Sequence, residues 1–278
     1  ADFRALAGTF TVLITNGEAT VTRALIASLP ALELIAVFGV GYDGVDVQAA
    51  AEHQVRVSHT PGVLTDDVAD LALGLMLATS RQIVAAHKFI EAGEWAAGGF
   101  PWTQKVSGSR VGIVGMGRIG QAIARRCEGF AMQIAYHDRK RLPALNYAWR
   151  EDLLTLAAES DFLVICTPGT AANQGLINQP VLAALGEKGI LINISRGSVI
   201  DEPALESGII AGAGLDVFSH EPAVPAGLLQ RSNVVVTPHM ASATWSTRAA
   251  MAQLVLDNVA CWAEKKALVT PVAESLAD

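Results

Sequence analysis

The sequence predicts an α/β fold in which two doubly wound parallel-sheet domains share one chain of 278 residues. Short apolar runs alternate with segments of helical periodicity along most of the chain, which is typical of strands joined by helical crossovers. A glycine-rich turn at residues 115–120 follows one of the apolar runs and lies near the middle of the chain. This central position indicates that one domain is inserted between two parts of the other.

The elements expected before this turn alternate between strand and helix. Strands are predicted at residues 11–15, 34–40 and 55–59, and helices at 20–28 and 47–53. A longer helix is expected from Thr65, a candidate N-cap that is followed by acidic residues near the helix start. Residues 68–77 of this helix are apolar nearly all round, which predicts burial against another domain or subunit.

The elements expected from the turn onward complete the inserted domain. Strands are predicted at residues 111–114, 133–137, 162–167, 190–195, 213–217 and 234–237, and a final helix at 244–265. Six parallel strands suffice for a complete doubly wound domain. We therefore expect residues 91–244 to form the inserted domain, whereas 1–90 and 245–278 form a smaller, discontinuous one.

The glycine-rich turn has the G-x-G-x-x-G spacing of a dinucleotide site between a strand and a helix. Gly115 permits the tight turn, Gly117 lets the backbone approach a pyrophosphate, and Gly120 lets the helix pack close to the strand. The first helical residues, Arg118 and Ile119, offer free N–H groups to the phosphates. An acidic residue also ends the next strand, so the sequence predicts a Rossmann-like dinucleotide site rather than a purely structural turn.

The choice between NAD and NADP stays open. Asp138 ends the second strand of the inserted domain, where a carboxylate would bond the ribose hydroxyls of NAD and repel a 2′-phosphate. Arg139, Lys140 and Arg141 follow at once, and a positive cluster there suits NADP. A site that accepts both cofactors, or one that tolerates NADP, is consistent with these residues.

The composition restricts the partners that we expect. The net charge of −7 argues against a nucleic-acid or anionic-membrane surface. Cys127, Cys166 and Cys261 show neither C-x-x-C nor metal-ligand spacing, so we expect buried thiols, no metal and a cytoplasmic protein. The N-terminus has no signal-peptide pattern, and no apolar stretch approaches membrane-spanning length.

Polar side chains follow three later strands of the inserted domain. Arg196 follows the strand at 190–195, and Asp216 and Glu221 follow the next one. His239 follows the last strand. Each has a common structural role, such as a surface salt bridge, a turn residue or a packed histidine. The carboxyl ends of parallel strands meet at the edge where a dinucleotide binds, so their convergence indicates a catalytic site.

Four motifs occur in order from Gly115 onward: G-M-G-R-I-G, N-I-S-R-G, G-L-D-V-F-x-x-E-P and T-P-H-x-A-S. Together they resemble the D-isomer-specific 2-hydroxyacid dehydrogenases over almost the entire chain. The motifs that begin at Phe38 (F-G-V-G-Y-D) and His59 (H-T-P-G-V-L-T-D-D-V-A-D) are most similar to those of glyoxylate/hydroxypyruvate and hydroxyphenylpyruvate reductases. The resemblance implies NAD(P)H-dependent reduction of a small 2-oxo acid (glyoxylate, hydroxypyruvate or an arylpyruvate) to the D-2-hydroxy acid.

The resemblance also implies roles for individual residues in catalysis. Arg196 would bind and polarise the substrate, and His239 would give or take the proton. Glu221 would hydrogen-bond His239 and raise the pKa of the imidazole, so that the protonated acid is available near neutral pH. The backbone N–H groups of Val40 and Gly41 would hold the substrate carboxylate, and closure of the two domains would exclude water.

The other implied contacts are with the dinucleotide. Asp216 would orient the nicotinamide carboxamide, with a structural strand-end role as the alternative. Thr65 would meet the cofactor near its phosphates, with helix capping as an equal alternative. Cys166, Thr167 and Pro168 would line the adenosine side of the site.

Two departures from the family pattern suggest missing residues. The chain opens at Ala1, at what resembles the second or third strand of the usual substrate domain. Residues 201–212 are shorter than the family's helix at this point, near Leu205 and Glu206. We therefore expect the sequence to be part of a somewhat longer protein.

The same motifs also occur in proteins with two other functions, and some apolar residues suggest an assembly. Formate dehydrogenases of the same superfamily carry Gln where Glu221 stands, which argues against that activity. A dinucleotide-sensing, corepressor-like interaction protein on this fold could keep the catalytic residues, although the reductase-type N-terminal motifs argue against it. A homodimer is expected from the apolar residues 68–77 and from Trp95 and Trp102, with ordinary core burial as the alternative.

Overall fold

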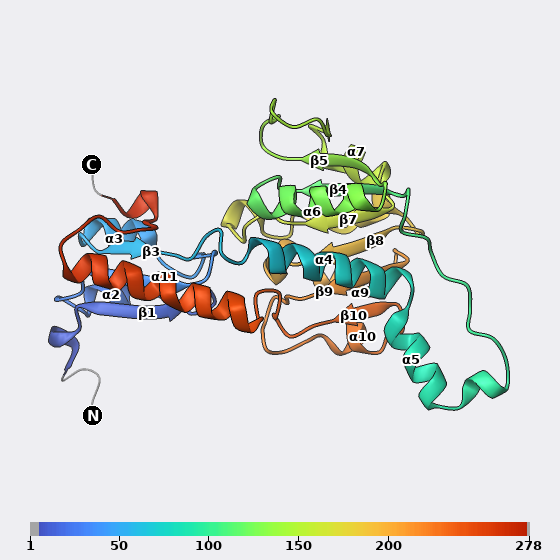
Figure 1. The fold of residues 1–278 in the computed structure, drawn as a ribbon, viewed down its shortest axis with the longest axis horizontal. Helices are drawn as coiled ribbons and strands as arrows, with labels where there is room; N and C mark the ends of the chain where they lie inside the picture. The colour runs from blue at the N-terminus through green and yellow to red at the C-terminus, as the bar shows by residue number, and fades with distance from the viewer. Residues whose placement is uncertain (1–5, 277–278) are drawn as a thin grey trace. The chain divides into compact units, whose positions relative to one another are not determined.

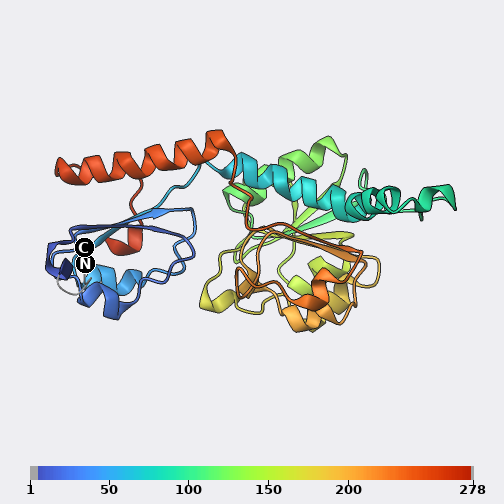
Figure 2. The ribbon, with the colours of Figure 1, turned by 90° about the horizontal axis from the view of Figure 1, so that it is seen from below.

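The computed structural model describes residues 6–276, and the chain divides into two compact units (Figures 1 and 2). The first unit contains the residues up to Leu64 and those from Ser242 onward, and the second is Thr65–Ala241. Residues 1–5 and 277–278 of the smaller expected domain lie outside the described residues. The second unit is therefore an insertion in the first, and its first boundary falls well before the expected one at residue 90.

A three-stranded parallel sheet in the order β1-β2-β3 forms the centre of the first unit. Its elements are β1 (Val12–Asn16), α2 (Arg23–Ala27), β2 (Leu34–Phe38), α3 (Val47–Glu52), β3 (Arg56–Ser58) and α11 (Trp245–Ala263), with the 3₁₀ turns η1 (Ala7–Thr9) and η5 (Ala273–Ser275). Ile35 and Val37 pack into one cluster with residues of α2 and α3, whereas Leu34 and Ala36 face Val255 of α11. Side chains alternate between the faces of a strand, so both faces of β2 are buried. Figure 2 shows helices on both sides of this sheet.

A seven-stranded parallel sheet in the order β10-β9-β8-β7-β4-β5-β6 forms the centre of the second unit. The strands are β4 (Arg110–Val114), β5 (Gln133–His137), β6 (Ala148–Trp149), β7 (Phe162–Ile165), β8 (Ile190–Asn193), β9 (Gly212–Leu215) and β10 (Val234–Val236). The chain runs outward from β4 to β6 and then returns to β7 beside β4, which is the switch point of a Rossmann fold. The strand β6 was missed because two residues show no periodicity.

Helices cover both faces of this larger sheet (Figure 1). They are α4 (Thr65–Ser80), α5 (Ile83–Glu91), α6 (Arg118–Gly129), α7 (Leu153–Ala158), α8 (Gln179–Leu185), α9 (Glu202–Glu206) and α10 (Ala226–Leu229), with the 3₁₀ turns η2 (Glu94–Ala96), η3 (Ala171–Asn173) and η4 (Gly197–Val199). Within residues 6–276 no single helix is long and apolar enough to cross a membrane, although α4 and α5, bent by 54°, pass that test as a pair.

The apolar helix α4 belongs to the second unit because it packs against α6 and the strands β8, β9 and β10. Leu75 and Met76 are buried there, and glycines in β9 allow a close approach: a Cβ on Gly214 would lie 3.0 Å from Leu75 Cβ. The apolar side chains of residues 68–77 are therefore mainly core, which was the alternative in the sequence. A homodimer stays a prediction.

Candidate active site

The site residues predicted in the second unit follow the carboxyl ends of its strands. Gly115 follows β4, Asp138 follows β5, and Cys166 follows β7, while Arg196 and His239 come after β8 and β10. All these strands are parallel, so their carboxyl ends share one edge of the sheet. The structure thus brings the glycine-rich turn and the predicted catalytic side chains to the same edge.

His239 and Glu221 form a close pair at this edge. His239 Nδ1 donates to Glu221 Oε2 at 2.7 Å, and the other carboxylate oxygen, Oε1, accepts the N–H of Phe218 at 2.8 Å. Burial alone would raise the pKa of Glu221. The hydrogen bonds from His239 and Phe218, with the charges of His239 and Arg196, outweigh burial and leave the pKa of Glu221 below its ordinary value. Glu221 is therefore a carboxylate that fixes the ring of His239 and stabilises its charged form.

Asp216 holds the loop that carries His239. Its carboxylate is fully buried, with Oδ1 accepting from Thr237 Oγ1 at 2.6 Å and from Met240 N at 2.9 Å. Oδ2 accepts from Ala241 N at 2.9 Å, and the backbone carbonyl of Asp216 accepts the N–H of His239 at 2.8 Å. His239 has a φ of 49°, a left-handed conformation that a non-glycine residue adopts only where its surroundings hold it.

The pKa of Asp216 is raised above its ordinary value, mainly by burial. The hydrogen bonds from Thr237, Met240 and Ala241 act in the opposite direction but do not outweigh burial. Through these contacts Asp216 has a structural role at the end of its strand, which was the alternative to cofactor binding in the sequence analysis. Its contact with a nicotinamide carboxamide stays a prediction.

Arg196 lies on a loop that buried polar contacts shape. Asn193, at the end of β8, accepts the N–H and hydroxyl of Ser195 through Oδ1 and donates through Nδ2 to the carbonyl of Arg196 at 2.9 Å. A Cβ on Gly197 would lie 1.8 Å from the backbone of Phe218, so only glycine fits there. The half-buried Arg196 side chain also donates from Nη1 to Ser195 O at 2.7 Å.

The glycine-rich turn offers a backbone cradle that fits a dinucleotide. Gly115 has a φ of 92°, and a Cβ on Gly120 would lie 2.2 Å from the carbonyl oxygen of Gly115. Around Gly117 nothing lies within 4 Å of a Cβ position, and this residue is the N-cap of α6, with no side-chain cap hydrogen bond. The amides of Arg118 and Ile119 at the helix start can therefore hold phosphate oxygens in that space.

On the predicted adenosine side, Asp138 is held by backbone hydrogen bonds and three basic residues follow it. Asp138 Oδ2 accepts the N–H of Met116 in the glycine-rich turn at 2.8 Å, and Oδ1 accepts the N–H of Arg139 at 2.7 Å. Arg139, Lys140 and Arg141 are exposed. An anionic 2′-phosphate would therefore meet exposed cationic side chains here, while Asp138 is held against the turn.

Thr167, Pro168 and Thr65 are positioned by separate elements. The side-chain amide of Asn173 donates to Thr167 Oγ1 and to the carbonyl of Pro168, both at 2.9 Å. Burial raises the pKa of the neighbouring Cys166 thiol, so the thiol stays neutral. Thr65 is the first residue of α4. Its contact with the cofactor and its alternative role as a helix cap both stay predictions.

Val40 and Gly41 follow β2 in the first unit. Among residues 6–276 neither backbone N–H donates a hydrogen bond, and the peptide between them is trans. Two adjacent unpaired N–H groups can bind a carboxylate. Their contact with a substrate stays a prediction.

Comparison with known proteins identifies the family. Residues 73–241 match the family described as D-isomer specific 2-hydroxyacid dehydrogenase, NAD binding domain. The chain belongs to this dehydrogenase family. It is 47% identical over 276 residues to hydroxyphenylpyruvate reductase from Plectranthus scutellarioides, covering 98% of this chain and 88% of the relative. It is 44% identical to glyoxylate/hydroxypyruvate reductase A from Arabidopsis thaliana, covering 94% and 84%.

A solved structure is similar throughout. The NADPH-dependent glyoxylate/hydroxypyruvate reductase from Sinorhizobium meliloti, in complex with NADP and malonate, superimposes with a TM-score of 0.92 at 44% identity. The match covers 99% of this dehydrogenase and 86% of the relative. This chain is therefore an oxidoreductase that uses NAD or NADP.

Some residues that shape the dehydrogenase site were not singled out from the sequence. Asn193 and Thr237 were parts of recognised motifs, but their hydrogen bonds to Arg196 and Asp216 depend on turns that spacing does not describe. The sequence signal that could have found them is a polar residue at the end of an apolar strand, because such side chains commonly hydrogen-bond a neighbouring backbone.

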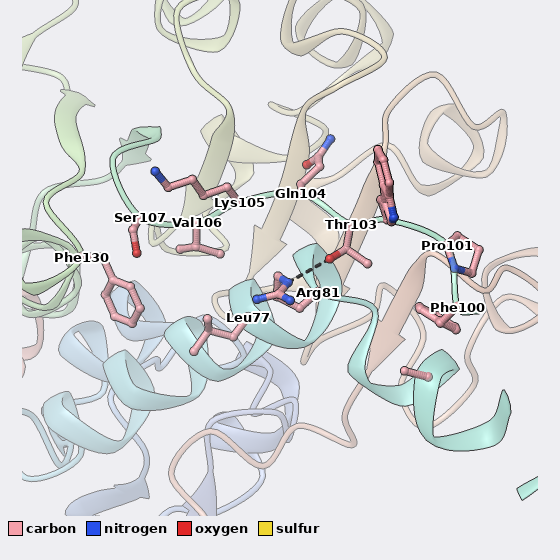
Figure 3. Close-up of a pocket in the computed structure, with 12 residues that line it drawn as sticks. Leu77, Arg81, Phe100, Pro101, Thr103, Gln104, Lys105, Val106, Ser107 and Phe130 are labelled. Atoms are coloured by element: carbon pink, nitrogen blue, oxygen red, sulfur yellow. Dashed lines mark hydrogen bonds between the residues drawn. The ribbon is translucent and has the colours of Figure 1, made fainter. Parts of the chain in front are cut away.

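A groove with a volume of about 640 Å³ lies away from the catalytic residues. Figure 3 shows its labelled lining, in which Arg81 Nε donates to Thr103 Oγ1 at 2.9 Å. Several lining residues, including Lys105 and Phe130, precede β4 and β5. The groove therefore lies at the amino edge of the sheet, opposite to the edge where the dehydrogenase residues meet.

Proposed function

We propose that the protein reduces a small 2-oxo acid, in the class of glyoxylate, hydroxypyruvate or an arylpyruvate, to the D-2-hydroxy acid with NADH or NADPH. The observation that carries this proposal is the pair of His239 and Glu221, 2.7 Å apart, on the sheet edge that also holds the glycine-rich turn. The names of the reductases to which the chain is 44–47% identical support the substrate class.

The chemistry divides among the chain's own residues. A bound nicotinamide dinucleotide supplies the hydride. Arg196 attracts the substrate's carboxylate and polarises its carbonyl, which favours the negative charge that develops on oxygen. Glu221 occupies Nδ1 of His239, so the proton passes to the developing alkoxide from Nε2. The backbone N–H groups of Val40 and Gly41 orient the carboxylate.

Steady-state kinetics with a panel of 2-oxo acids and both cofactors test this proposal. We expect turnover of at least one of glyoxylate, hydroxypyruvate and phenylpyruvate with both NADPH and NADH. Arg139→Ala is expected to raise the KM for NADPH about 10-fold and to leave the KM for NADH within about twofold, because only NADPH carries the 2′-phosphate. Cofactor binding without turnover of any acid would instead support the dinucleotide-sensing alternative.

We also propose that the protein is a homodimer that pairs through α5 and the segment after it. Ile83, Val84 and Ile90 are exposed on α5, and Trp95 and Trp102 are 66% and 101% exposed. Large exposed aromatic residues near an open groove favour a protein interface, and a second copy of the chain is the partner proposed.

Light scattering coupled to gel filtration tests the dimer. The unmodified protein is expected to have the mass of two chains, and the double variant Trp95→Asp, Trp102→Asp the mass of one. Trp245→Asp is the matched control, because Trp245 is 96% exposed but lies in the other unit. A double variant that keeps the mass of the unmodified protein would contradict this interface.

A further inference from the structure

The loop after β2 is held through its carbonyl groups by residues that follow β3. Thr60 N donates to the carbonyl of Gly39 at 2.8 Å. His59 Nδ1 lies 2.9 Å from the carbonyl oxygen of Val40. A carbonyl only accepts, so Nδ1 of His59 carries the hydrogen and donates it. Two successive carbonyls are thus occupied, whereas the N–H groups of Val40 and Gly41 have no partner among the described residues.

The bond from His59 determines where the N–H of Gly41 points. The carbonyl of Val40 and the N–H of Gly41 belong to one peptide unit, which is planar and trans. In such a unit the C=O and N–H bonds point in opposite directions. Holding the carbonyl of Val40 towards His59 therefore directs the N–H of Gly41 away from it.

His59 is itself firmly placed. Its ring meets Tyr42 edge to face, with ring centroids 5.3 Å apart and planes at 85°. Its backbone N–H donates to the carbonyl of Thr270 at 3.2 Å, and Thr270 Oγ1 donates back to the carbonyl of His59 at 2.6 Å. Asn258 of α11 donates to the same hydroxyl at 2.9 Å. The imidazole therefore has a defined position from which to hold the loop.

We propose that His59 is a positioning residue, which aims the N–H of Gly41 at the substrate carboxylate and so sets the affinity for the 2-oxo acid. The inference rests on the proposed function, because that function places the carboxylate at Val40 and Gly41. His59 touches neither the reacting carbonyl nor the dinucleotide in this role. Its effect is therefore on KM for the acid and not on the chemical step.

Two variants at position 59 separate the donor from the ring. His59→Phe keeps an aromatic ring beside Tyr42 but removes the donor to Val40. His59→Asn keeps a donor, because its Nδ2 occupies about the place of the imidazole Nδ1. In the NADPH-saturated enzyme we expect His59→Phe to raise KM for glyoxylate about 10-fold, with kcat within about twofold, as for one weakened hydrogen bond to a charged group. His59→Asn is expected to stay within about threefold of the unmodified KM.

Equal KM values in the unmodified enzyme and His59→Phe would overturn the inference but leave the proposed function intact. An equal rise in both variants would also overturn it, since the ring and not the donor would then matter. Calorimetric titration of malonate into the NADP-loaded protein gives a readout without turnover. If the unmodified protein reduces no 2-oxo acid, the proposed function fails. Malonate affinity then decides the inference: weaker binding to His59→Phe alone supports it, and equal binding to all three proteins overturns it.

Discussion

Replacing His239 with asparagine is expected to lower kcat for 2-oxo acid reduction by about 10³-fold, within the range that general acid catalysis contributes. The side chain of asparagine cannot deliver a proton to an alkoxide. Asparagine nevertheless tolerates the left-handed backbone that His239 adopts, so the loop should keep its conformation. The KM for the acid and the dissociation constant for NADPH should each change less than about threefold.

Stopped-flow hydride transfer and fluorescence titration of NADPH measure these two quantities. His239→Ala should give the same loss of kcat, with an added loss of thermal stability, because alanine is strained at a φ of 49°. A His239→Asn protein that retains more than about a tenth of the unmodified kcat would exclude His239 as the proton donor.

The pH dependence of 2-oxo acid reduction tests whether the charge of Glu221 stabilises the protonated His239. Its carboxylate lies 2.7 Å from Nδ1 of His239, and a negative charge at that distance favours the protonated imidazole. Because the pKa of Glu221 is below its ordinary value, this carboxylate stays charged as the pH falls towards that value. Neutralising it in Glu221→Gln should therefore move the alkaline limb of the reduction profile to lower pH. An unchanged limb would mean that Glu221 orients the ring without acting through its charge.

The sequence was sufficient for the elements whose signals are local. The glycine spacing and the flanking apolar run predicted β4, α6 and β5, because a tight turn, a helix start and a buried strand each restrict residue types. The strand β6 has two residues, too few for a period of two to show. The start of the inserted unit, at Thr65, was missed because it coincides with the start of α4. The apolar sequence of this helix predicts burial but does not indicate which of the two sheets it packs against.

The catalytic residues were also predictable as a set, whereas their supports were not. Arg196 and His239 each follow a strand, and the carboxyl ends of parallel strands lie at one edge of the sheet. Their positions in the sequence therefore indicated that the two side chains meet at that edge. The hydrogen bonds of Asp216 to Thr237, Met240 and Ala241 depend on a turn with a left-handed histidine, which no spacing predicts. The contact of His59 with Val40 joins loops after two different strands and likewise has no local signal.

Replacing Arg196 with alanine is expected to lower kcat/KM for the 2-oxo acid by about 10³-fold, with NADPH affinity within about threefold. The guanidinium both binds the carboxylate and stabilises charge developing on the carbonyl oxygen, so its loss raises KM and lowers kcat together. Arg196→Lys should recover part of kcat/KM but not all, since a lysine carries the charge without the planar two-pronged donor.

Gly169 offers a separate test of how Arg196 is placed. A Cβ at Gly169 would lie 2.7 Å from Arg196 Cγ, so Gly169→Ala should displace the arginine stem without removing its charge. We expect a loss of kcat/KM about as large as in Arg196→Lys, and no additional loss in the double variant Gly169→Ala, Arg196→Ala compared with Arg196→Ala alone. Steady-state kinetics of the four proteins measure this coupling. Independent, additive losses would show that Gly169 acts on the reaction by a route other than Arg196.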